Sequence, residues 1–320
     1  MPKPPRTHAL LGLLLWLVTV GHAWFGVEWA RLWYYQLAWW GYIIFADGLV
    51  KARQGNSLLW DRERAFYFMA FSSTSFWFLF ELLNMAALHN WHYEGVEHVR
   101  WLRWLGAHVA FATVVPGVLI TFELLTARGL WATVPVRPLP PGTAWYGWFY
   151  AGGALTLLLP LAWPGLFFPL VWGALVLLLE PLNHRLGAPS LMRDWQGGDL
   201  GNLCRLLLAG LFCGLLWESQ NFLSSARWVY TLPWLNEPKI FAMPLAGFLG
   251  FPPFALECFC AMSSLSLLRR GRGWRAGEHL RPTRPPLPGW LAPLLLAAAL
   301  AFNLLVLYLM DQRVIMSFAD

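Results

Sequence analysis

Long apolar stretches, each near the length needed to cross a lipid bilayer, recur along the whole chain. Such stretches cross as helices, whose backbone groups are all paired within the segment. Hydrophobic residues make up 58% of the chain and charged residues only 12%, far from the composition of a water-soluble domain. We predict an all-α polytopic membrane protein with about nine spans, at residues 9–27, 33–50, 65–88, 104–126, 146–163, 165–182, 203–222, 241–268 and 290–310.

The charges between the spans predict how the chain is oriented. Most of the 23 Lys and Arg residues fall before the first span and in the loops after the second, fourth, sixth and eighth. Because positive loops stay in the cytoplasm, we expect a cytoplasmic N-terminus and an external Asp320. The first stretch follows Lys3 and Arg6 as a signal peptide would, but it is long and no small-residue cleavage site follows it. We expect it to remain as a span.

The net charge of +6 does not indicate a nucleic-acid partner. Contact with anionic lipid headgroups would explain the arginine-rich loop that contains Arg269, Arg270, Arg272 and Arg275. All four cysteines fall in predicted spans, where Cys behaves as a small apolar residue, and none belongs to a C-x-x-C pair. We therefore expect neither a disulfide framework nor redox chemistry.

One short segment occurs twice, 137 residues apart. ELLNMAALHNWHY and ESQNFLSSARWVY both fit the pattern E-x₂-N-x₆-W-x-Y. The glutamate and the asparagine share one helix face, and a carboxyl group inside an apolar span is expensive to bury. The two copies place the same residue types in register, namely Glu81, Asn84, Trp91 and Tyr93 against Glu218, Asn221, Trp228 and Tyr230.

Similar features around the motif widen the repeat to four spans per half. An acidic residue ends the preceding span in each half, Asp47 and Glu180, and a span with Gly, Pro and a glutamate follows. Four spans return the chain to its starting side, so the halves should be parallel and related by an approximate two-fold axis along the membrane normal. We predict a first four-helix repeat at 1–126, a Pro-rich cytoplasmic linker at 127–144, a second repeat at 145–270, a basic linker at 271–289 and an additional helix at 290–320.

The intramembrane acids have two interpretations that the sequence leaves open. Burial disfavours the charged form of a carboxyl group, and a buried protonated acid can protonate a carbon–carbon double bond or relay protons. Alternatively, each motif glutamate bonds the Asn, Trp or Tyr of its own copy and holds helices together. The Gly/Pro spans likewise are either broken near a binding site or kinked for packing.

Asp47 and Glu180, near span ends, are expected to act as caps, while Glu123 and Glu257 lie deeper. We predict acid or base roles for Glu81, Glu218 and Glu257, and substrate contacts for Asn84, Asn221, Trp91, Tyr93, Trp228 and Tyr230.

A cluster of His89, His92, Glu94, Glu97 and His98 has the residue types of a metal site, but the second half has no counterpart. No P-loop, Rossmann glycine pattern, H-E-x-x-H or G-x-S-x-G occurs, so nucleotide use and triad hydrolysis have no support. We predict neither a metal nor a cofactor.

The duplicated layout resembles the lycopene cyclase domain family, the small membrane-embedded carotenoid cyclases of bacteria and archaea. The resemblance covers about residues 35–125 and 168–268, with few identities. It departs from the family where a paired Glu-Glu follows the proline, since only single glutamates stand here. It implies acid-initiated cyclisation of an isoprenoid without a consumed cofactor, in a bacterial inner membrane. The positions that carry it are Glu81, Trp91, Tyr93, Pro116 and Glu123, then Glu218, Trp228, Tyr230, Pro244 and Glu257.

Three functions remain open. The first is an enzyme acting on a membrane lipid or isoprenoid substrate with the motif acids. The second is a proton-coupled carrier, which needs a polar path from Asp47 and Glu180 to Glu81 and Glu218. The third is a structural or assembly protein whose motifs only pack helices. The sequence names no partner protein.

Overall fold

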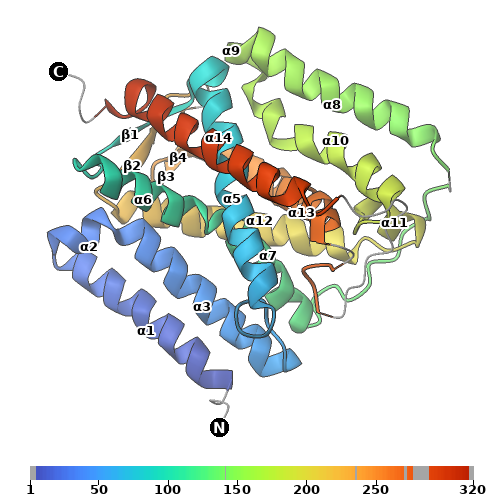
Figure 1. Cartoon of the computed structure of the whole chain (residues 1–320), viewed down its shortest axis with the longest axis horizontal. Coiled ribbons are helices and arrows are strands. Elements are labelled where there is room, and N and C mark those ends of the chain that lie inside the picture. Colours follow the sequence, from blue (N-terminus) through green and yellow to red (C-terminus); the bar gives the residue numbers. More distant parts are fainter. Residues whose placement is uncertain (1–4, 141, 235, 270–271, 277–287, 317–320) are drawn as a thin grey trace.

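The computed structural model describes residues 5–140, 142–234, 236–269, 272–276 and 288–316, and these are mostly helical (Figure 1). A π-helical turn, η1 (Asn84–Leu88), continues the helix that carries the first motif. The first predicted half forms α1 (Pro5–Trp24), α2 (Glu28–Leu32), α3 (Tyr34–Gln54), α4 (Leu58–Asp61), α5 (Glu63–Leu83), α6 (Arg100–Phe111) and α7 (Val114–Ala127).

The second predicted half is also helical, with three short 3-10 helices. Its α-helices are α8 (Ala144–Ala162), α9 (Pro164–Phe167), α10 (Val171–Leu186), α11 (Leu191–Gln196), α12 (Gly201–Leu223) and α13 (Phe251–Ser266). The 3-10 helices are η2 (Phe168–Leu170), η3 (Leu245–Gly250) and η4 (Leu267–Arg269). Helix α14 (Leu291–Arg313) comes last.

Two antiparallel pairs of short strands complete the fold. All four strands lie on the side of the molecule where Figure 1 marks the C-terminus. They are β1 (Trp91–Glu94) paired with β2 (Arg227–Tyr230), and β3 (Lys239–Ile240) paired with β4 (Met243–Pro244).

Seven helical stretches within the described residues are long and apolar enough to cross a membrane, as an integral membrane protein requires. They are Arg6–Trp24, Glu63–Leu88, Arg100–Ala127, Pro164–Leu186, Gly201–Leu223, Leu245–Arg269 and Leu291–Arg313. The predicted spans at 33–50 and 146–163 are helical too, as α3 and α8, but they are not among the seven. Composition explains this, because α3 contains Gln36, Asp47 and Lys51, and α8 begins with Trp and Tyr residues of low hydropathy.

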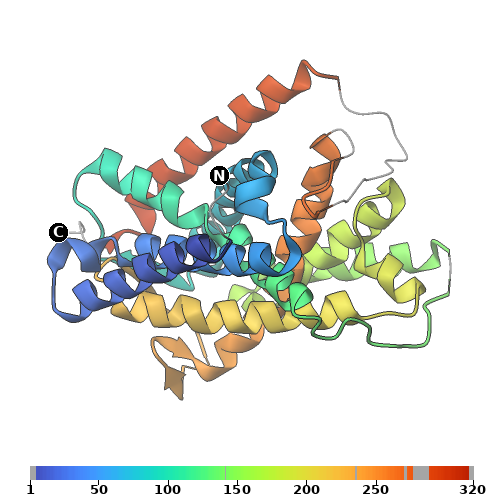
Figure 2. The same cartoon turned by 90° about the horizontal axis from the view of Figure 1, so that it is seen from below.

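Helix packing follows the same order in each predicted half. In the first, α1 packs on α3, α3 on α7 and α5 on α7; in the second, α8 packs on α10, α10 on α13 and α12 on α13. Figures 1 and 2 show α1 with α3 at one edge of the molecule and α8 with α10 at the opposite edge. Between the halves, α7 contacts both α12 and α13. The helices that carry Glu123, Glu218 and Glu257 therefore meet in the middle.

Both spans that contain Gly and Pro are interrupted partway. Between α6 and α7, the Ser73 hydroxyl donates to the Phe111 carbonyl at 2.6 Å and accepts from the Val115 amide at 3.0 Å. In the second half, η3 gives way to α13 at Phe251, and a Cβ on Gly210 of α12 would lie 2.5 Å from the Phe251 carbonyl oxygen. A neighbouring helix thus bonds or closely covers each break, as irregular backbone at membrane depth requires.

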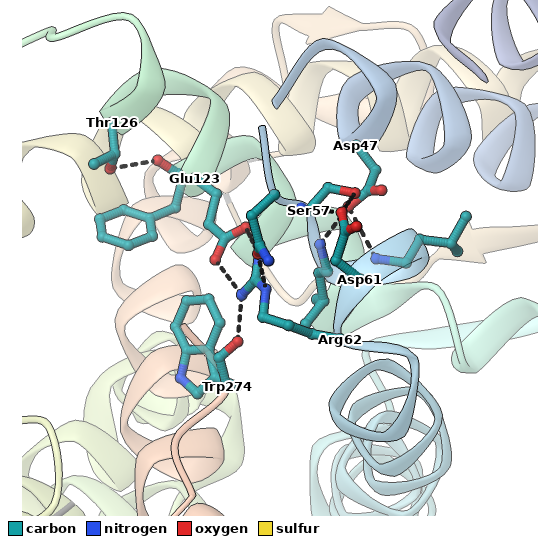
Figure 3. A network of polar contacts seen from close by, with 11 residues as sticks. Asp47, Ser57, Asp61, Arg62, Glu123, Thr126 and Trp274 are labelled. Carbon is teal, nitrogen blue, oxygen red and sulfur yellow. Dashed lines mark hydrogen bonds and ion pairs between the residues drawn. The ribbon is translucent and has the colours of Figure 1, made fainter. Parts of the chain in front are cut away.

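The segment before α14 is docked into the bundle. Of the predicted basic linker at 271–289, residues 271 and 277–287 lie outside the described residues, as does Arg270 just before it. The Trp274 side chain is fully buried, and Arg62 donates both to the Trp274 carbonyl and to Glu123 (Figure 3). Arg275 stacks over the Phe122 ring, 4.6 Å from its centroid. The sequence led us to expect Arg275 among lipid headgroups. In the structure its guanidinium group packs on an aromatic ring of the bundle instead.

Helix α14 packs on α5, and residues at its C-terminal end also bond α6 and β1. Asp311 accepts from Arg103 Nε at 2.9 Å and from Trp104 Nε1 at 3.0 Å. The Val314 carbonyl accepts from the Tyr93 amide at 2.7 Å. The chain end thus holds β1 in place.

Close approach of α1 and α3 depends on glycine. A Cβ on Gly12 would lie 2.2 Å from the Phe45 amide nitrogen, and one on Gly48 would lie 2.4 Å from the Ala9 amide nitrogen. Small residues of this kind let membrane helices pack backbone to backbone.

Gly12→Ala should therefore separate α1 from α3 and lower the free energy of unfolding by about 1–3 kcal/mol, the usual cost of overpacking. Gly21→Ala in the same helix is the matched control, because no atom lies within 4 Å of its added Cβ. That control should be neutral or slightly stabilising, since alanine is the better helix former. Thermal unfolding in detergent measures both, and equal melting temperatures for the two variants would contradict the packing argument.

Candidate functional site

The asparagine of each motif copy holds the strand that follows it. Asn84 Nδ2 donates to the Trp91 carbonyl at 2.8 Å, and Asn221 Nδ2 donates to the Trp228 carbonyl at 3.0 Å. The side-chain oxygens accept backbone amides of the same turns, from Asn90 at 2.7 Å and from Trp228 at 3.0 Å. Both asparagines are fully buried. They position the backbone and do not line a cavity.

The two strands positioned in this way pair with each other. Trp91 lies opposite Tyr230, and Tyr93 lies opposite Trp228. Each motif tryptophan therefore faces the motif tyrosine of the other copy across an antiparallel ladder. Residues 137 positions apart in the sequence are brought into one site by this pairing.

Glu81 is completely buried and well supplied with donors. Its Oε1 accepts from the Tyr93 hydroxyl at 2.5 Å and from Trp77 Nε1 at 2.9 Å. Trp91 Nε1 lies 3.2 Å from both carboxyl oxygens. Three side-chain donors surround this one group, which makes it a packing element of the first half.

Glu218 is also completely buried, but its hydrogen bonding differs. Its Oε1 accepts from the Tyr230 hydroxyl at 2.5 Å, as in the first copy. Trp228 Nε1 donates to the Tyr230 hydroxyl at 2.7 Å and so supports the carboxyl only indirectly. Among the described residues, Glu218 Oε2 has no hydrogen-bond partner. A buried acceptor without a partner is uncommon and needs an explanation.

The difference between the copies comes from the residue one turn before each glutamate. Trp77 stands four residues before Glu81, and Gly214 stands four residues before Glu218. A Cβ on Gly214 would lie 2.3 Å from the Phe251 ring, so that ring occupies the space beside the glycine. An indole donor in the first copy is replaced by a phenyl ring, which donates nothing.

A cavity opens beside Glu218. It holds about 100 Å³ and is lined mostly by aromatic residues, with Glu218 among the others. Of the predicted site residues, Trp91, Tyr93, Trp228, Tyr230 and Glu218 line it, and Glu81, Glu257, Asn84 and Asn221 do not. We call this space the inner cavity; its other lining residues include Tyr35, Trp77, Phe111, Trp172, Trp217, Phe251 and Phe254.

The tyrosines of the site stay protonated. Burial, followed by the nearby glutamate, raises the pKa of Tyr93 and of Tyr230 well above the ordinary value. Each hydroxyl therefore remains a donor to its glutamate over the whole physiological pH range.

Glu257 lies one turn beyond Phe254, away from the inner cavity. Its Oε1 accepts from the Leu175 amide at 3.0 Å, and its Oε2 has no partner within the described part of the chain. That amide follows a kink in α10 at Trp172, whose ψ of 23° is not helical. Trp172 stacks on Phe80 and lines the inner cavity. The contact assigns Glu257 to holding the kink that places this wall.

Asp47 and Glu180 cap the short helices that follow their own spans. Asp47 Oδ1 accepts from the Leu58 amide at 2.9 Å, and Glu180 Oε1 accepts from the Met192 amide at 2.8 Å. Glu123 forms a two-pronged ion pair with Arg62, with both N···O distances 2.8 Å (Figure 3). None of the three lines the inner cavity.

The histidine cluster does not form a metal site in the described residues. His92 Nε2 lies 3.1 Å from Glu94 Oε1, and the Glu97 carboxyl accepts the Val99 amide at 3.0 Å. No other group of three or more metal-ligating side chains converges in this part of the chain. The side chains of the inner cavity are likewise not a metal-ligand set.

Sequence reasoning did not single out Trp77, Trp172 and Trp217. Trp77 could have been found, because it stands one turn before Glu81 and its indole therefore faces that carboxyl. The other two carry no local signal, since their place in the wall depends on how α10 and α12 pack.

The two motif glutamates should differ in what they contribute to stability. Glu81→Gln replaces an acceptor oxygen by an amide nitrogen that cannot accept from Trp or Tyr, so we expect a loss of about 1–3 kcal/mol in unfolding free energy. Glu218→Gln can place its nitrogen where the unpartnered oxygen stands, so we expect a loss below about 1 kcal/mol. Equilibrium unfolding in mixed detergent micelles compares the two variants. Equal losses would show that the donor count does not decide stability.

Glu257 offers a separate test of a positioning role. Glu257→Gln keeps a carbonyl oxygen for the Leu175 amide and should leave the fold and the cavity unchanged. Glu257→Leu removes that acceptor and should cost about 1–3 kcal/mol, because a buried amide is left unpaired. Tryptophan fluorescence and thermal unfolding report the two effects. If Glu257→Gln were as damaging as Glu257→Leu, the acidic proton itself would be required.

Comparison of the chain with protein-family models, with curated proteins and with solved structures found no significant match.

Proposed function

We propose that the protein is a membrane-embedded enzyme that uses Glu218 to protonate a carbon–carbon double bond of a lipid-soluble isoprenoid. The observation that carries the proposal is Glu218 Oε2, a buried carboxyl oxygen without a partner in the described residues, in a side chain whose residue lines a cavity rich in aromatic rings. Its counterpart Glu81 has three donors and faces no cavity. A carboxyl oxygen that has no hydrogen-bond partner within the described residues is available to a ligand.

The surroundings of Glu218 suit a hydrocarbon and the cation that protonation makes from it. Tyr35, Trp77, Trp217, Phe251 and Phe254 present rings to the inner cavity. Aromatic faces stabilise a nearby positive charge by about 0.5–2 kcal/mol each. A wall of this kind also excludes water, which would otherwise add to the cation and end the reaction as an alcohol.

The proposed step needs no consumed cofactor. The π electrons of a double bond take the proton of the Glu218 carboxylic acid, which leaves a carboxylate and a cation on the more substituted carbon. A second double bond of the same chain can attack this cation and close a ring. A carbon beside the final cation then loses a proton to the carboxylate, which restores the acid and a double bond. The product is an isomer of the substrate.

The size of the inner cavity limits what enters it. A space of about 100 Å³ holds roughly one isoprene unit, if the cavity that binds benzene in another protein, about 150 Å³, is taken as the scale. We therefore propose that the end of an isoprenoid chain reacts here, while the rest of a long polyene such as lycopene extends outside. The resemblance to the lycopene cyclase domain family supports the same substrate class.

We also propose that the protein is built from two parallel four-helix repeats with α14 added, in a bacterial inner membrane with the N-terminus in the cytoplasm. The matching helix contacts of the two halves and the identical asparagine bonds of the two motifs support the repeat. The antiparallel pairing of β1 with β2 fits an approximate two-fold axis between them. The loop charges support the orientation.

The other two functions are supported less by the contacts. A carrier needs the carboxyls of Asp47 and Glu180 to face a lumen shared with Glu218, yet both bond the backbone of adjoining loops. A purely structural role agrees well with Glu81, but it leaves the unpartnered oxygen of Glu218 unexplained.

The proposal is tested by incubating purified protein with lycopene in heavy water and measuring deuterium in the products by mass spectrometry. We expect the wild type to incorporate deuterium from its exchanged carboxylic acid into an isomeric product. Glu218→Gln should lower that rate by at least about 100-fold, the usual contribution of a general acid. The equilibrium unfolding experiment described for Glu218→Gln above also tests whether this variant is folded.

Glu94→Gln is the matched control, because Glu94 is a partly exposed carboxyl on β1 outside the inner cavity. It should react at the wild-type rate. Deuterium incorporation by Glu218→Gln at the rate of this control would exclude Glu218 as the acid.

A further inference from the structure

A second cavity lies against the inner one. It holds about 90 Å³ and is bounded by α3, α6, α14, the two paired strands and the loop after β1. We call it the outer cavity. Tyr35, Tyr93, Phe111 and Trp228 line both cavities, so these four side chains form a common wall.

The common wall is connected to the candidate acid. Trp228 Nε1 donates to the Tyr230 hydroxyl, and that hydroxyl donates to Glu218 Oε1. The Trp228 ring meets the Tyr35 ring edge to face, with centroids 5.4 Å apart. A ligand that reaches from one cavity into the other passes these rings and lies beside Glu218.

The outer cavity has one uncharged amide side chain, that of Gln36, on its wall. Gln36 of α3 lines the outer cavity, and the buried Gln36 Oε1 has no hydrogen-bond partner in the described residues. Gln36 Nε2 makes only a long bond to the Gly106 carbonyl, at 3.4 Å. One strong acceptor is therefore free at this wall.

The charged residues of the outer cavity are already engaged. Arg103 donates to Asp311 Oδ1 at 2.9 Å and to the Glu97 carbonyl at 2.7 Å. The Glu97 carboxyl accepts the Val99 amide at 3.0 Å. These contacts point the charges at protein groups, which leaves a neutral hydrogen-bond donor as the ligand chemistry that Gln36 would recognise.

We propose that the outer cavity binds the hydroxyl end of an isoprenoid whose double bond meets Glu218, so that an isoprenoid alcohol binds more tightly than the same chain without its hydroxyl group. This inference rests on the proposed function for the reacting end, but the hydroxyl subsite is defined by Gln36 alone. Each cavity has room for roughly one isoprene unit on the scale used above. A chain of two units that ends in a hydroxyl group is the shortest ligand that fills both.

Geraniol and the same chain without its hydroxyl, 2,6-dimethylocta-2,6-diene, form the matched pair of probes. Binding to the full-length protein in detergent is followed by the fluorescence of the tryptophans that line both cavities. Gln36→Leu should weaken geraniol binding by about 3- to 10-fold, the value of one neutral hydrogen bond, and should leave the diene unchanged. Comparing the two probes within each variant cancels their different partition into detergent.

Ala107→Leu fills part of the outer cavity with a larger side chain and leaves Gln36 unchanged. It should therefore weaken the binding of both probes. It keeps the proposal testable if Gln36→Leu does not fold. Equal effects of Gln36→Leu on geraniol and the diene, or no effect on either, would overturn the hydroxyl subsite. So would geraniol binding that Ala107→Leu leaves unchanged.

Glu218→Gln separates this inference from the proposed function. It should bind geraniol within about twofold of the wild type, because the hydroxyl subsite is intact, while deuterium incorporation is lost. If deuterium incorporation instead persists in Glu218→Gln while Gln36→Leu weakens only geraniol, the proposed acid is wrong and the hydroxyl subsite stands.

Discussion

The hydrogen bond from a strand tyrosine to a buried glutamate is the contact on which the centre of this protein depends. It occurs twice, from Tyr93 to Glu81 and from Tyr230 to Glu218, each at 2.5 Å. A carboxyl group in an apolar interior is costly unless a donor reaches it. Trp77 of α5 also donates to Glu81, but the tyrosine donor of each copy stands on β1 or β2, so these strands must fold back over the helix ends to supply it. The asparagine bonds and the pairing of the two strands follow from that requirement.

The two copies of the motif share this contact but differ in everything around it. In the first, Trp77 and Trp91 complete the shell of Glu81 and leave no room for a ligand. In the second, Gly214 and Phe251 replace the indole donor, and an oxygen of Glu218 is left at a cavity. The first copy is thus fully hydrogen-bonded, whereas the second has an unpartnered oxygen in a residue that lines a cavity. Of the two explanations that the sequence left open, packing agrees with the contacts of Glu81, and chemistry is what we propose for Glu218.

Much of the fold could be predicted from the sequence, because membrane helices are encoded by local apolar runs. The motif residues could be found for a similar reason, since their spacing repeats without a gap. The strands at Trp91 and Trp228 were expected only as loops. Their pairing joins segments far apart in the chain, and no local pattern encodes such a contact. The contact of Glu257 could not be predicted for the same reason, because its partner is the Leu175 amide of another helix.

The sequence by itself determined that this chain is a helical membrane protein with a repeated acidic motif, since the length and polarity of each segment are local properties. It also determined that Glu81 and Glu218 would be buried, because apolar residues surround both. Only the tertiary structure decided which glutamate faces a cavity. That choice depends on whether a Trp or a Gly precedes the acid by one helical turn and on which ring fills the space beside the glycine. The ring belongs to α13, and only the packing of α12 against α13 brings it there.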